Sequence, residues 1–323
     1  MTISQQQPIP TEGRYILVAP HHFPDLNREH ALAVELGVEI VAARDAEHFR
    51  EALPGAAVVM VTPYVNLPAD DIATIRLPAA IVRYGIGYDN IDVAAAVEAG
   101  IPVSIVPDSS SEEVASHAFA MGVALVRRLP AGDSAIRRSE WAGTIAYEAP
   151  AFRDLTVGVV GFGRIGRHVA RLYEAIGAQV RAYDPFIDVD ESVRSELDEA
   201  LTSSDIITLH VPLSDDTKNL ISRDVLARVK PGAVIVNVSR GGLIDEEALA
   251  DALRECTISG AGLDTFSTEP LGATNPLRSA PNTLLTPHIA WRSNVSVGAL
   301  QSGAVHRARL ALTGGELIDV VVR

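Results

Sequence analysis

Four polar residues in the second half of the sequence each follow an apolar run typical of a buried strand. Arg240 follows VIVNV, and Asp264 ends ISGAGLD with Glu269 a few residues further on. His288 lies in TPHIAW, directly after NTLL. A histidine can exchange a proton near neutral pH, and ligands of open α/β sheets bind outside the carboxyl ends of strands. A lone histidine at a strand end is more often a packed core residue, so its neighbours decide the interpretation.

A glycine-rich segment, VGVVGFGRIGRHVA, predicts a dinucleotide site. Gly161, Gly163 and Gly166 have the GxGxxG spacing, an apolar run precedes them and a helical pattern follows. The first glycine permits a tight turn, the second lets the backbone approach a pyrophosphate, and the third allows close helix–strand packing. The amino end of the helix favours anions, and Arg164 adds a positive charge there.

An acidic residue after the next apolar run indicates which dinucleotide binds. Asp184 ends AQVRAYD, and no Lys or Arg directly follows it in DPFIDVD. A carboxylate in this place hydrogen-bonds the adenosine ribose and repels a 2′-phosphate. The sequence therefore predicts NAD as the cofactor in preference to NADP.

The elements that must position these residues follow an alternating pattern along the chain. RYILVAP, AAVVMV and AAIVRY are short apolar runs separated by stretches with helical spacing, and a second such series begins at LTVGVV. This alternation predicts βαβ units, and near-continuous apolar strands fit a parallel sheet covered on both faces. We expect a long helix over residues 109–130, closed by two arginines and a proline, and a last helix over about 294–312.

Composition excludes several classes of function. Lys and Arg number 27 against 41 Asp and Glu, which gives a net charge of −14. Nucleic acids and anionic membranes attract basic surfaces, so neither is expected as a partner. Cys256 is the only cysteine, His21, His22 and His30 lack the spacing of a metal site, and no metal is expected. The sequence shows no signal peptide or membrane-spanning run and predicts a cytoplasmic protein.

Taken together, the motifs resemble those of the D-isomer-specific 2-hydroxyacid dehydrogenase family from about residue 14 onward. The markers are RYGIGYDNID, SSEEVASHA, VGVVGFGRIG, HVPL, VNVSRGGLIDE, GLDTFSTEP and TPHIAW, in the family's order. The HIAW and GYDNID forms are most similar to its phosphoglycerate dehydrogenase-like and C-terminal-binding-protein-like branches. The resemblance implies two doubly wound parallel-sheet α/β domains. A Rossmann NAD-binding domain would span residues 107–289, and a smaller flavodoxin-like substrate domain would comprise residues 1–106 and 290–323.

The resemblance also assigns roles to residues. Arg240, Glu269 and His288 would form the catalytic trio: His288 exchanges the proton, Glu269 favours its charged form, and Arg240 holds and polarises the substrate. Backbone N–H groups of Gly85, Ile86 and Gly87 would bind the substrate carboxylate. The implied cofactor-binding set, which also includes the trio's Arg240 and His288, is Gly161, Gly163, Arg164, Ile165, Gly166, Asp184, His210, Val211, Pro212, Thr217, Val238, Ser239 and Asp264.

Trp291 distinguishes this sequence within the resemblance, because the family often has a small residue there. One interpretation is that the indole narrows the pocket and contacts the substrate side chain, with Tyr64 or Tyr84 opposite. The other is that it packs as a structural residue.

The predicted function is NAD-dependent interconversion of a D-2-hydroxy acid and its 2-oxo acid. The alternative is an NAD(H)-responsive regulatory protein similar to C-terminal-binding corepressors, with little turnover. The catalytic trio is expected in both cases, so it does not discriminate between them. The resemblance further implies a homodimer formed through the NAD-binding domains.

Overall fold

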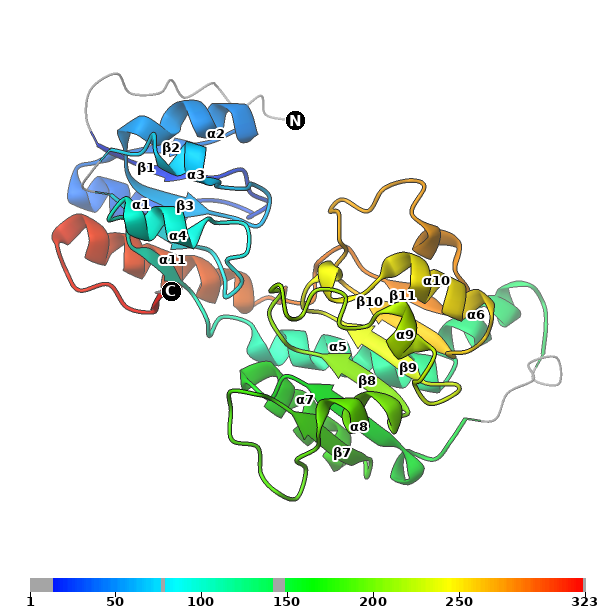
Figure 1. Ribbon diagram of the computed structural model, residues 1–323. Coiled ribbons are helices and arrows are strands. Elements are labelled where there is room, and N and C mark those ends of the chain that lie inside the picture. Colours follow the sequence, from blue (N-terminus) through cyan, green and yellow to red (C-terminus); the bar gives the residue numbers. More distant parts are fainter. Residues whose placement is uncertain (1–13, 77–78, 142–148, 322–323) are drawn as a thin grey trace. The chain divides into compact units, whose positions relative to one another are not determined.

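The computed structural model describes residues 14–76, 79–141 and 149–321 and divides the chain into two compact units. The first unit, here the split unit, comprises residues up to Ser110 together with those from Arg292 onward. The second, the central unit, comprises Ser111–Trp291. Each contains one six-stranded sheet with helices on both faces (Figure 1).

The sheet of the split unit has the strand order β12-β5-β4-β3-β1-β2. Five strands are parallel, and β12 pairs antiparallel with β5. The parallel part therefore has the flavodoxin-like 2-1-3-4-5 order. The strands are β1 (Tyr15–Val18), β2 (Glu39–Ala42), β3 (Ala56–Val61), β4 (Ala80–Arg83), β5 (Val103–Ile105) and β12 (Val320–Val321).

Helices cover both faces of this sheet because its strands are apolar on both sides; every residue of β3 is buried. α2, α3 and α4 contribute to the apolar cluster on one face. α11 packs on β3 and β4, and α1 packs against α11. The helices are α1 (Asn27–Leu36), α2 (Ala46–Ala52), α3 (Ala69–Ile72), α4 (Val93–Glu98) and α11 (Ser296–Thr313).

The sheet of the central unit is parallel throughout, in the order β11-β10-β9-β8-β6-β7. An isolated parallel bridge between Ala182 and Arg194 places a short further segment beside β7, at the edge of the sheet. With that bridge the order is 3-2-1-4-5-6-7, which is the 3-2-1-4-5-6 arrangement of a Rossmann fold with β11 added beside β10. The strands are β6 (Thr156–Val160), β7 (Gln179–Tyr183), β8 (Ile206–Leu209), β9 (Val234–Asn237), β10 (Gly260–Leu263) and β11 (Thr283–Leu285).

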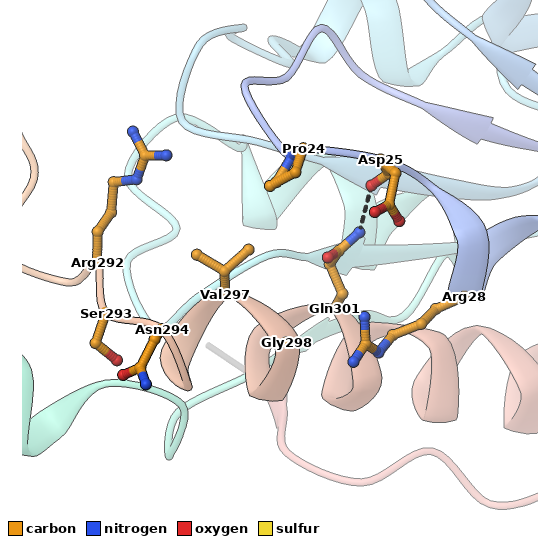
Figure 2. Close-up of a pocket in the computed structure, with 9 residues that line it drawn as sticks. All are labelled: Pro24, Asp25, Arg28, Arg292, Ser293, Asn294, Val297, Gly298 and Gln301. Carbon is orange, nitrogen blue, oxygen red and sulfur yellow. Dashed lines mark hydrogen bonds between the residues drawn. The ribbon is translucent and has the colours of Figure 1, made fainter.

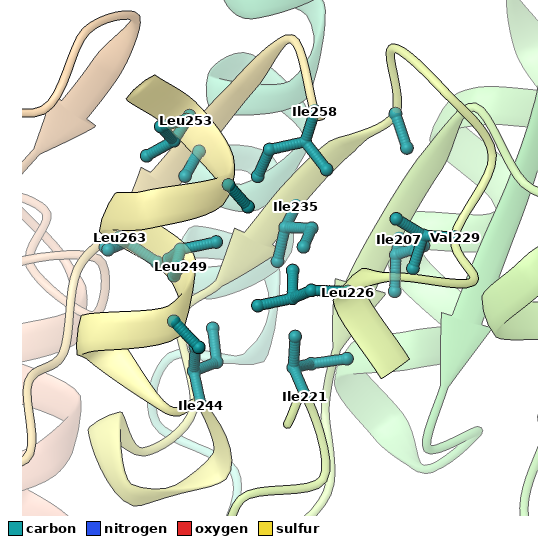
Figure 3. Close-up of a cluster of buried hydrophobic side chains, with 14 of the residues drawn as sticks. Ile207, Ile221, Leu226, Val229, Ile235, Ile244, Leu249, Leu253, Ile258 and Leu263 are labelled. Carbon is teal, nitrogen blue, oxygen red and sulfur yellow. The ribbon is translucent and has the colours of Figure 1, made fainter. Parts of the chain in front are cut away.

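Two apolar clusters hold helices to the faces of the central sheet. α5 and α7 pack on one face. On the other, Leu249 and Leu253 of α10 and Leu226 of α9 meet Ile207 and Ile235 of the strands (Figure 3). The helices are α5 (Ser111–Val126), α6 (Leu129–Arg137), α7 (Arg164–Ala175), α8 (Leu197–Thr202), α9 (Arg223–Leu226) and α10 (Glu246–Arg254). The expected fold class is confirmed.

One expected element is wrong in detail. The helix expected over residues 109–130 ends at Val126, and Arg128 adopts a left-handed conformation with φ 54°. Pro130 lies in the first turn of α6 and does not stop a helix. A proline is tolerated there because the first-turn N–H groups have no partner within the helix.

None of the helices in the described ranges is long and apolar enough to cross a membrane.

Candidate active site

The loop after β6 has the local geometry of a dinucleotide-binding turn. Gly161 has φ +94°, and a Cβ there would lie 2.5 Å from the carbonyl oxygen of His210. A Cβ on Gly166 would lie 2.0 Å from the oxygen of Gly161, so only glycine allows α7 to start this close to the strand. A Cβ on Gly163, by contrast, meets no atom within 4 Å. The open space at Gly163 is where a pyrophosphate could approach the backbone.

Asp184, which follows β7, is tied to this loop. Its Oδ2 accepts the N–H of Phe162 at 2.8 Å, and its Oδ1 accepts those of Phe186 and Ile187 at 2.9 and 3.1 Å. A carboxylate has about four acceptor sites, so one remains for a ribose hydroxyl. Arg181, the nearest strand arginine, pairs with Glu199 at 2.7 Å.

Two further strand ends of the central unit carry the other predicted cofactor residues. After β8, Nε2 of His210 lies 2.8 Å from the hydroxyl of Thr208, and the Thr217 hydroxyl donates to the carbonyl of Pro212. Burial lowers the pKa of His210 to about 3, so this imidazole is neutral. After β9, the Ser239 hydroxyl donates to Leu209. Val238 is buried, whereas Val211 and Ile165 are half-buried against the two apolar clusters.

The turn that carries Arg240 lies directly against the loop that carries Glu269. Asn237 is fully buried, and its Nδ2 donates to the carbonyl of Arg240 at 2.7 Å. A Cβ on Gly241 would lie 1.9 Å from the carbonyl carbon of Phe266 and 2.1 Å from the nitrogen of Ser267. The glycine after Arg240 is therefore required for the close approach of these two backbones.

Glu269 and His288 form a direct pair, with Glu269 Oε2 2.7 Å from His288 Nδ1. The other Glu269 oxygen accepts the N–H of Phe266 at 3.0 Å. Burial alone would raise the pKa of Glu269. The hydrogen bond and charge of His288, with contributions from the Phe266 N–H and Arg240, hold that pKa below its usual value. The carboxylate therefore stays charged beside the imidazole.

Asp264 organises the turn that presents His288. It is fully buried and accepts the Thr286 hydroxyl at 2.5 Å and the N–H groups of Ile289 and Ala290 at 2.9 and 2.8 Å. Its own carbonyl accepts the N–H of His288 at 2.8 Å. These four bonds hold the chain at His288 itself and on both sides of it in the sequence.

His288 itself has φ 54°, a left-handed conformation that a non-glycine residue adopts at a cost. Such a conformation costs on the order of 1–3 kcal/mol and persists where surrounding contacts determine it. Trp291 is one of those contacts, because its Nε1 donates to the His288 carbonyl at 3.1 Å. The half-buried indole also packs against the apolar cluster under α5 and α7.

His117, a residue that the sequence analysis leaves unassigned, lies in this region. Its Nε2 is 3.1 Å from the Thr286 hydroxyl and 3.9 Å from Oδ1 of Asp264. The sequence gives little signal for this, since the position is simply an interior one of a helix, six residues after the first residue of α5. Asn237 was missed as well, although an asparagine at the end of an apolar strand, three residues before Arg240, is a detectable signal.

The split unit carries the remaining predicted residues. Gly85 has φ +119°, and the Arg83 side chain donates to Asn90 and to the carbonyl of Tyr84, which braces the Gly85–Gly87 turn. Ile86 is 47% exposed and Tyr64 48% exposed, and the Tyr64 ring lies 4.6 Å from that of His22.

The expectation that the Tyr84 side chain contacts substrate is wrong. The residue is 2% exposed, and its hydroxyl donates to the buried Glu29 at 2.8 Å. Its ring also packs on Phe23. Tyr84 is a core residue because both the ring and the hydroxyl are used within the split unit.

Residues 119–290 match the D-isomer specific 2-hydroxyacid dehydrogenase family, in its NAD binding domain. The matched segment is more than half of the chain and holds the glycine loop, Arg240, Asp264, Glu269 and His288. This chain belongs to that family.

Relatives across the family have similar sequences and folds. The D-3-phosphoglycerate dehydrogenase of Mycobacterium tuberculosis is 35% identical over 296 residues, which cover 90% of this chain but 56% of that protein. The chain thus spans about half the length of this curated relative. Among solved structures, Aquifex aeolicus D-lactate dehydrogenase complexed with NAD and lactic acid is 27% identical, with a TM-score of 0.84, covering 93% of this chain and 96% of that one. A glyoxylate reductase from Paecilomyes thermophila is 28% identical, with a TM-score of 0.86, covering 97% and 99%.

The family's NAD-binding domain accounts for the geometry of the loop after β6. The open face of Gly163 leaves room for a pyrophosphate, and the amino end of α7 has no side-chain cap. Asp184 retains an acceptor for a ribose, and its own loop carries no cation for a 2′-phosphate. The residues present therefore fit NAD, the cofactor expected from the sequence.

Proposed function

We propose that this chain is an NAD-dependent dehydrogenase that interconverts a D-2-hydroxy acid and its 2-oxo acid. The observation that carries the proposal is the 2.7 Å pair of Glu269 and His288, held at the carboxyl ends of β10 and β11. A histidine with one nitrogen bonded to a carboxylate is a positioned general acid and base.

When bound, NADH would supply a hydride to the carbonyl carbon in the direction of reduction. His288 supplies the proton to the carbonyl oxygen from Nε2, because Nδ1 is bonded to Glu269. Glu269 remains charged and stabilises the imidazolium before the proton leaves. The 2-oxo acid gains one hydride and one proton and becomes the 2-hydroxy acid; oxidation runs these transfers in reverse.

Arg240 would hold the substrate carboxylate and polarise the carbonyl with its fork of donors. Its influence on the pKa of Glu269 supports a position near the pair. Backbone N–H groups of Gly85, Ile86 and Gly87 would also bind the carboxylate. Asp264 would bind the nicotinamide carboxamide, as the resemblance implies, in addition to orienting the His288 turn. Trp291 and Tyr64 stay candidates for contact with the substrate side chain.

The test is a panel of glyoxylate, pyruvate, hydroxypyruvate, phenylpyruvate and 3-phosphohydroxypyruvate, each with NADH, followed by loss of NADH absorbance. Turnover of at least one acid supports the dehydrogenase, and the rank order gives the substrate. NADH binding without turnover of any acid would favour the alternative, an NAD(H)-responsive regulatory protein similar to C-terminal-binding corepressors.

A homodimer formed through the central unit is the second part of the proposal. Leu129 and Ile136, seven residues apart on one face of α6, are 59% and 57% exposed, and the nearby Trp141 is 75% exposed. Large apolar side chains gathered on a surface often mark a protein–protein interface. The expected cytoplasmic location stays a prediction.

A further inference from the structure

A cavity of about 500 Å³ lies in the split unit, where the amino ends of α1 and α11 come together (Figure 2). Its volume is within the range of small-molecule sites, roughly 300–1,000 Å³. None of the residues to which catalysis was assigned above lines it. The lining residues are Pro24, Asp25, Arg28, Arg292, Ser293, Asn294, Val297, Gly298 and Gln301.

The charges of this lining are unusual for so acidic a chain. Two arginines, Arg28 and Arg292, line the cavity, and Asp25 is the only carboxylate among the lining residues. The local balance is therefore positive in a protein whose net charge is −14. Pro24 and Val297 add apolar surface, with the Val297 side chain pointing toward Pro24 (Figure 2).

A hydrogen bond holds the Arg28 side chain in place and leaves its terminal N–H donors for a ligand. Its Nε donates to the Ser302 hydroxyl at 3.0 Å, which orients the guanidinium plane. A Cβ on Gly298 would lie 3.1 Å from Nη2 of Arg28, so the glycine leaves room for the guanidinium over α11. No carboxylate within the described ranges forms an ion pair with Arg28, whereas Arg309, further along α11, pairs with Glu35.

A buried amide in the lining is also fixed in place. Gln301 is 2% exposed, and its Nε2 donates to the carbonyl of Asp25 at 2.9 Å and to Glu29 at 3.2 Å. The loop before α1 is thereby tied to α11. The cavity walls are preorganised, which reduces the ordering cost of binding a ligand.

We propose that this cavity binds the oxyanion of a small acid, a carboxylate or a phosphate, with Arg28 as the principal donor. The terminal N–H groups of a guanidinium match two oxygens of such an anion. Arg292 adds positive charge, and Pro24 and Val297 accept a short apolar body. The lining shares no residue with the proposed catalytic set, so the failure of either proposal leaves the other standing.

The experiment titrates propionate and, separately, inorganic phosphate into protein with isotope-labelled valine methyl groups, at constant ionic strength. The readout is the Val297 methyl resonance, identified by its loss in Val297→Ala. Saturating NAD fills the expected pyrophosphate site, and an Arg240→Met background weakens the expected substrate-carboxylate site, of which only the Gly85–Gly87 N–H groups remain. The probe that shifts the resonance saturably identifies the ligand class.

Arg28→Met in the same background keeps the aliphatic stem and removes the donors. We expect binding to weaken about tenfold or more, the usual effect of losing a charged hydrogen bond. Arg309→Met, which removes an arginine of α11 outside the cavity, should leave binding unchanged. The proposal is overturned if neither probe shifts the Val297 resonance saturably, or if Arg28→Met binds as tightly as its parent.

Discussion

At the scale of single residues, the site depends on a charged carboxylate beside an imidazole. Glu269 keeps a pKa below its usual value because His288, the Phe266 N–H and Arg240 outweigh the effect of burial. A half-exposed ion pair adds little stability. Its proposed importance lies in the orientation of His288, whose Nδ1 lies 2.7 Å from the Glu269 carboxylate.

Glu269→Gln should lower kcat/KM about ten- to a hundredfold, since an amide cannot stabilise the imidazolium as a carboxylate does. NADH affinity should change little. Steady-state kinetics with the best 2-oxo acid, together with NADH titration, measure both quantities. The exposed Glu316 offers a matched control, Glu316→Gln, which should behave as wild type. Unchanged turnover in Glu269→Gln would contradict the assigned role.

The same pKa shift has a consequence for stability. The folded-state pKa of Glu269 is lowered from 4.5, so its stabilising contribution is present above pH 4.5 and is lost as the pH falls through the folded value. Urea unfolding of wild type and Glu269→Gln should therefore differ more at neutral pH than in acid. An equal difference at every pH would show that the carboxylate titrates normally.

At the scale of elements, the loops after β9, β10 and β11 are held together by contacts that patterns in the sequence do not reveal. Gly241 lets the Arg240 turn touch the backbone of the Glu269 loop, and Asp264 holds the turn of His288. The strands and the glycine loop could be predicted, because apolar periodicity and GxGxxG spacing are local signals. Contacts such as His117 with Thr286 could not, since they join residues 169 positions apart.

Two glycines of the loop after β6 should respond differently to alanine. Gly166→Ala places a Cβ against the Gly161 oxygen and should lower the free energy of unfolding by about 1–3 kcal/mol or more. Gly163→Ala meets no atom and should change stability by less than about 1 kcal/mol. Its Cβ should instead weaken NAD binding by about 1–3 kcal/mol. Denaturation and NAD titration separate the two. If Gly163→Ala bound NAD as tightly as wild type, the pyrophosphate would not bind at this loop.

Asp264→Asn should destabilise the turn of His288. Ile289 donates to Oδ1 and Ala290 to Oδ2, and asparagine keeps only one oxygen, so one of these N–H groups loses its acceptor and faces an amide nitrogen; we expect a loss of about 1–3 kcal/mol in the free energy of unfolding and lower activity. Thr286→Val removes the hydroxyl contacts with Asp264 and His117 but leaves both backbone N–H groups paired, so it should have a smaller effect. Equal effects of the two substitutions would argue against Asp264 as the organiser of the turn.

At the scale of the whole molecule, both sheets have the strand orders of doubly wound folds, which the alternating pattern predicts. The third strand position of the central sheet, reduced to a bridge at Arg194, has no apolar run and could not be predicted. Tyr84 shows a second limit of prediction from sequence. Its place beside Gly85 suggested a substrate contact, yet its hydroxyl donates to Glu29, a buried residue of α1, within the core.

The proposed dimer has a direct test. Ile136→Asp introduces a charge on the exposed apolar face of α6 and should shift sedimentation from dimer toward monomer. Val34→Asp, at an exposed apolar position of the split unit, is the matched control and should remain dimeric. A monomeric wild type would contradict the proposed dimer. A dimer unaffected by Ile136→Asp would show that the interface does not include this face of α6.

The central claim is that His288 exchanges the proton, and its most direct test is the turnover of His288→Asn. With the best 2-oxo acid of the panel, kcat should fall by about a hundredfold or more, the usual contribution of a general acid. NADH binding and the unfolding midpoint should stay near wild type, and His306→Asn, at an exposed histidine of α11, should retain full activity. A His288→Asn variant that binds NADH and turns over at the wild-type rate would contradict the account.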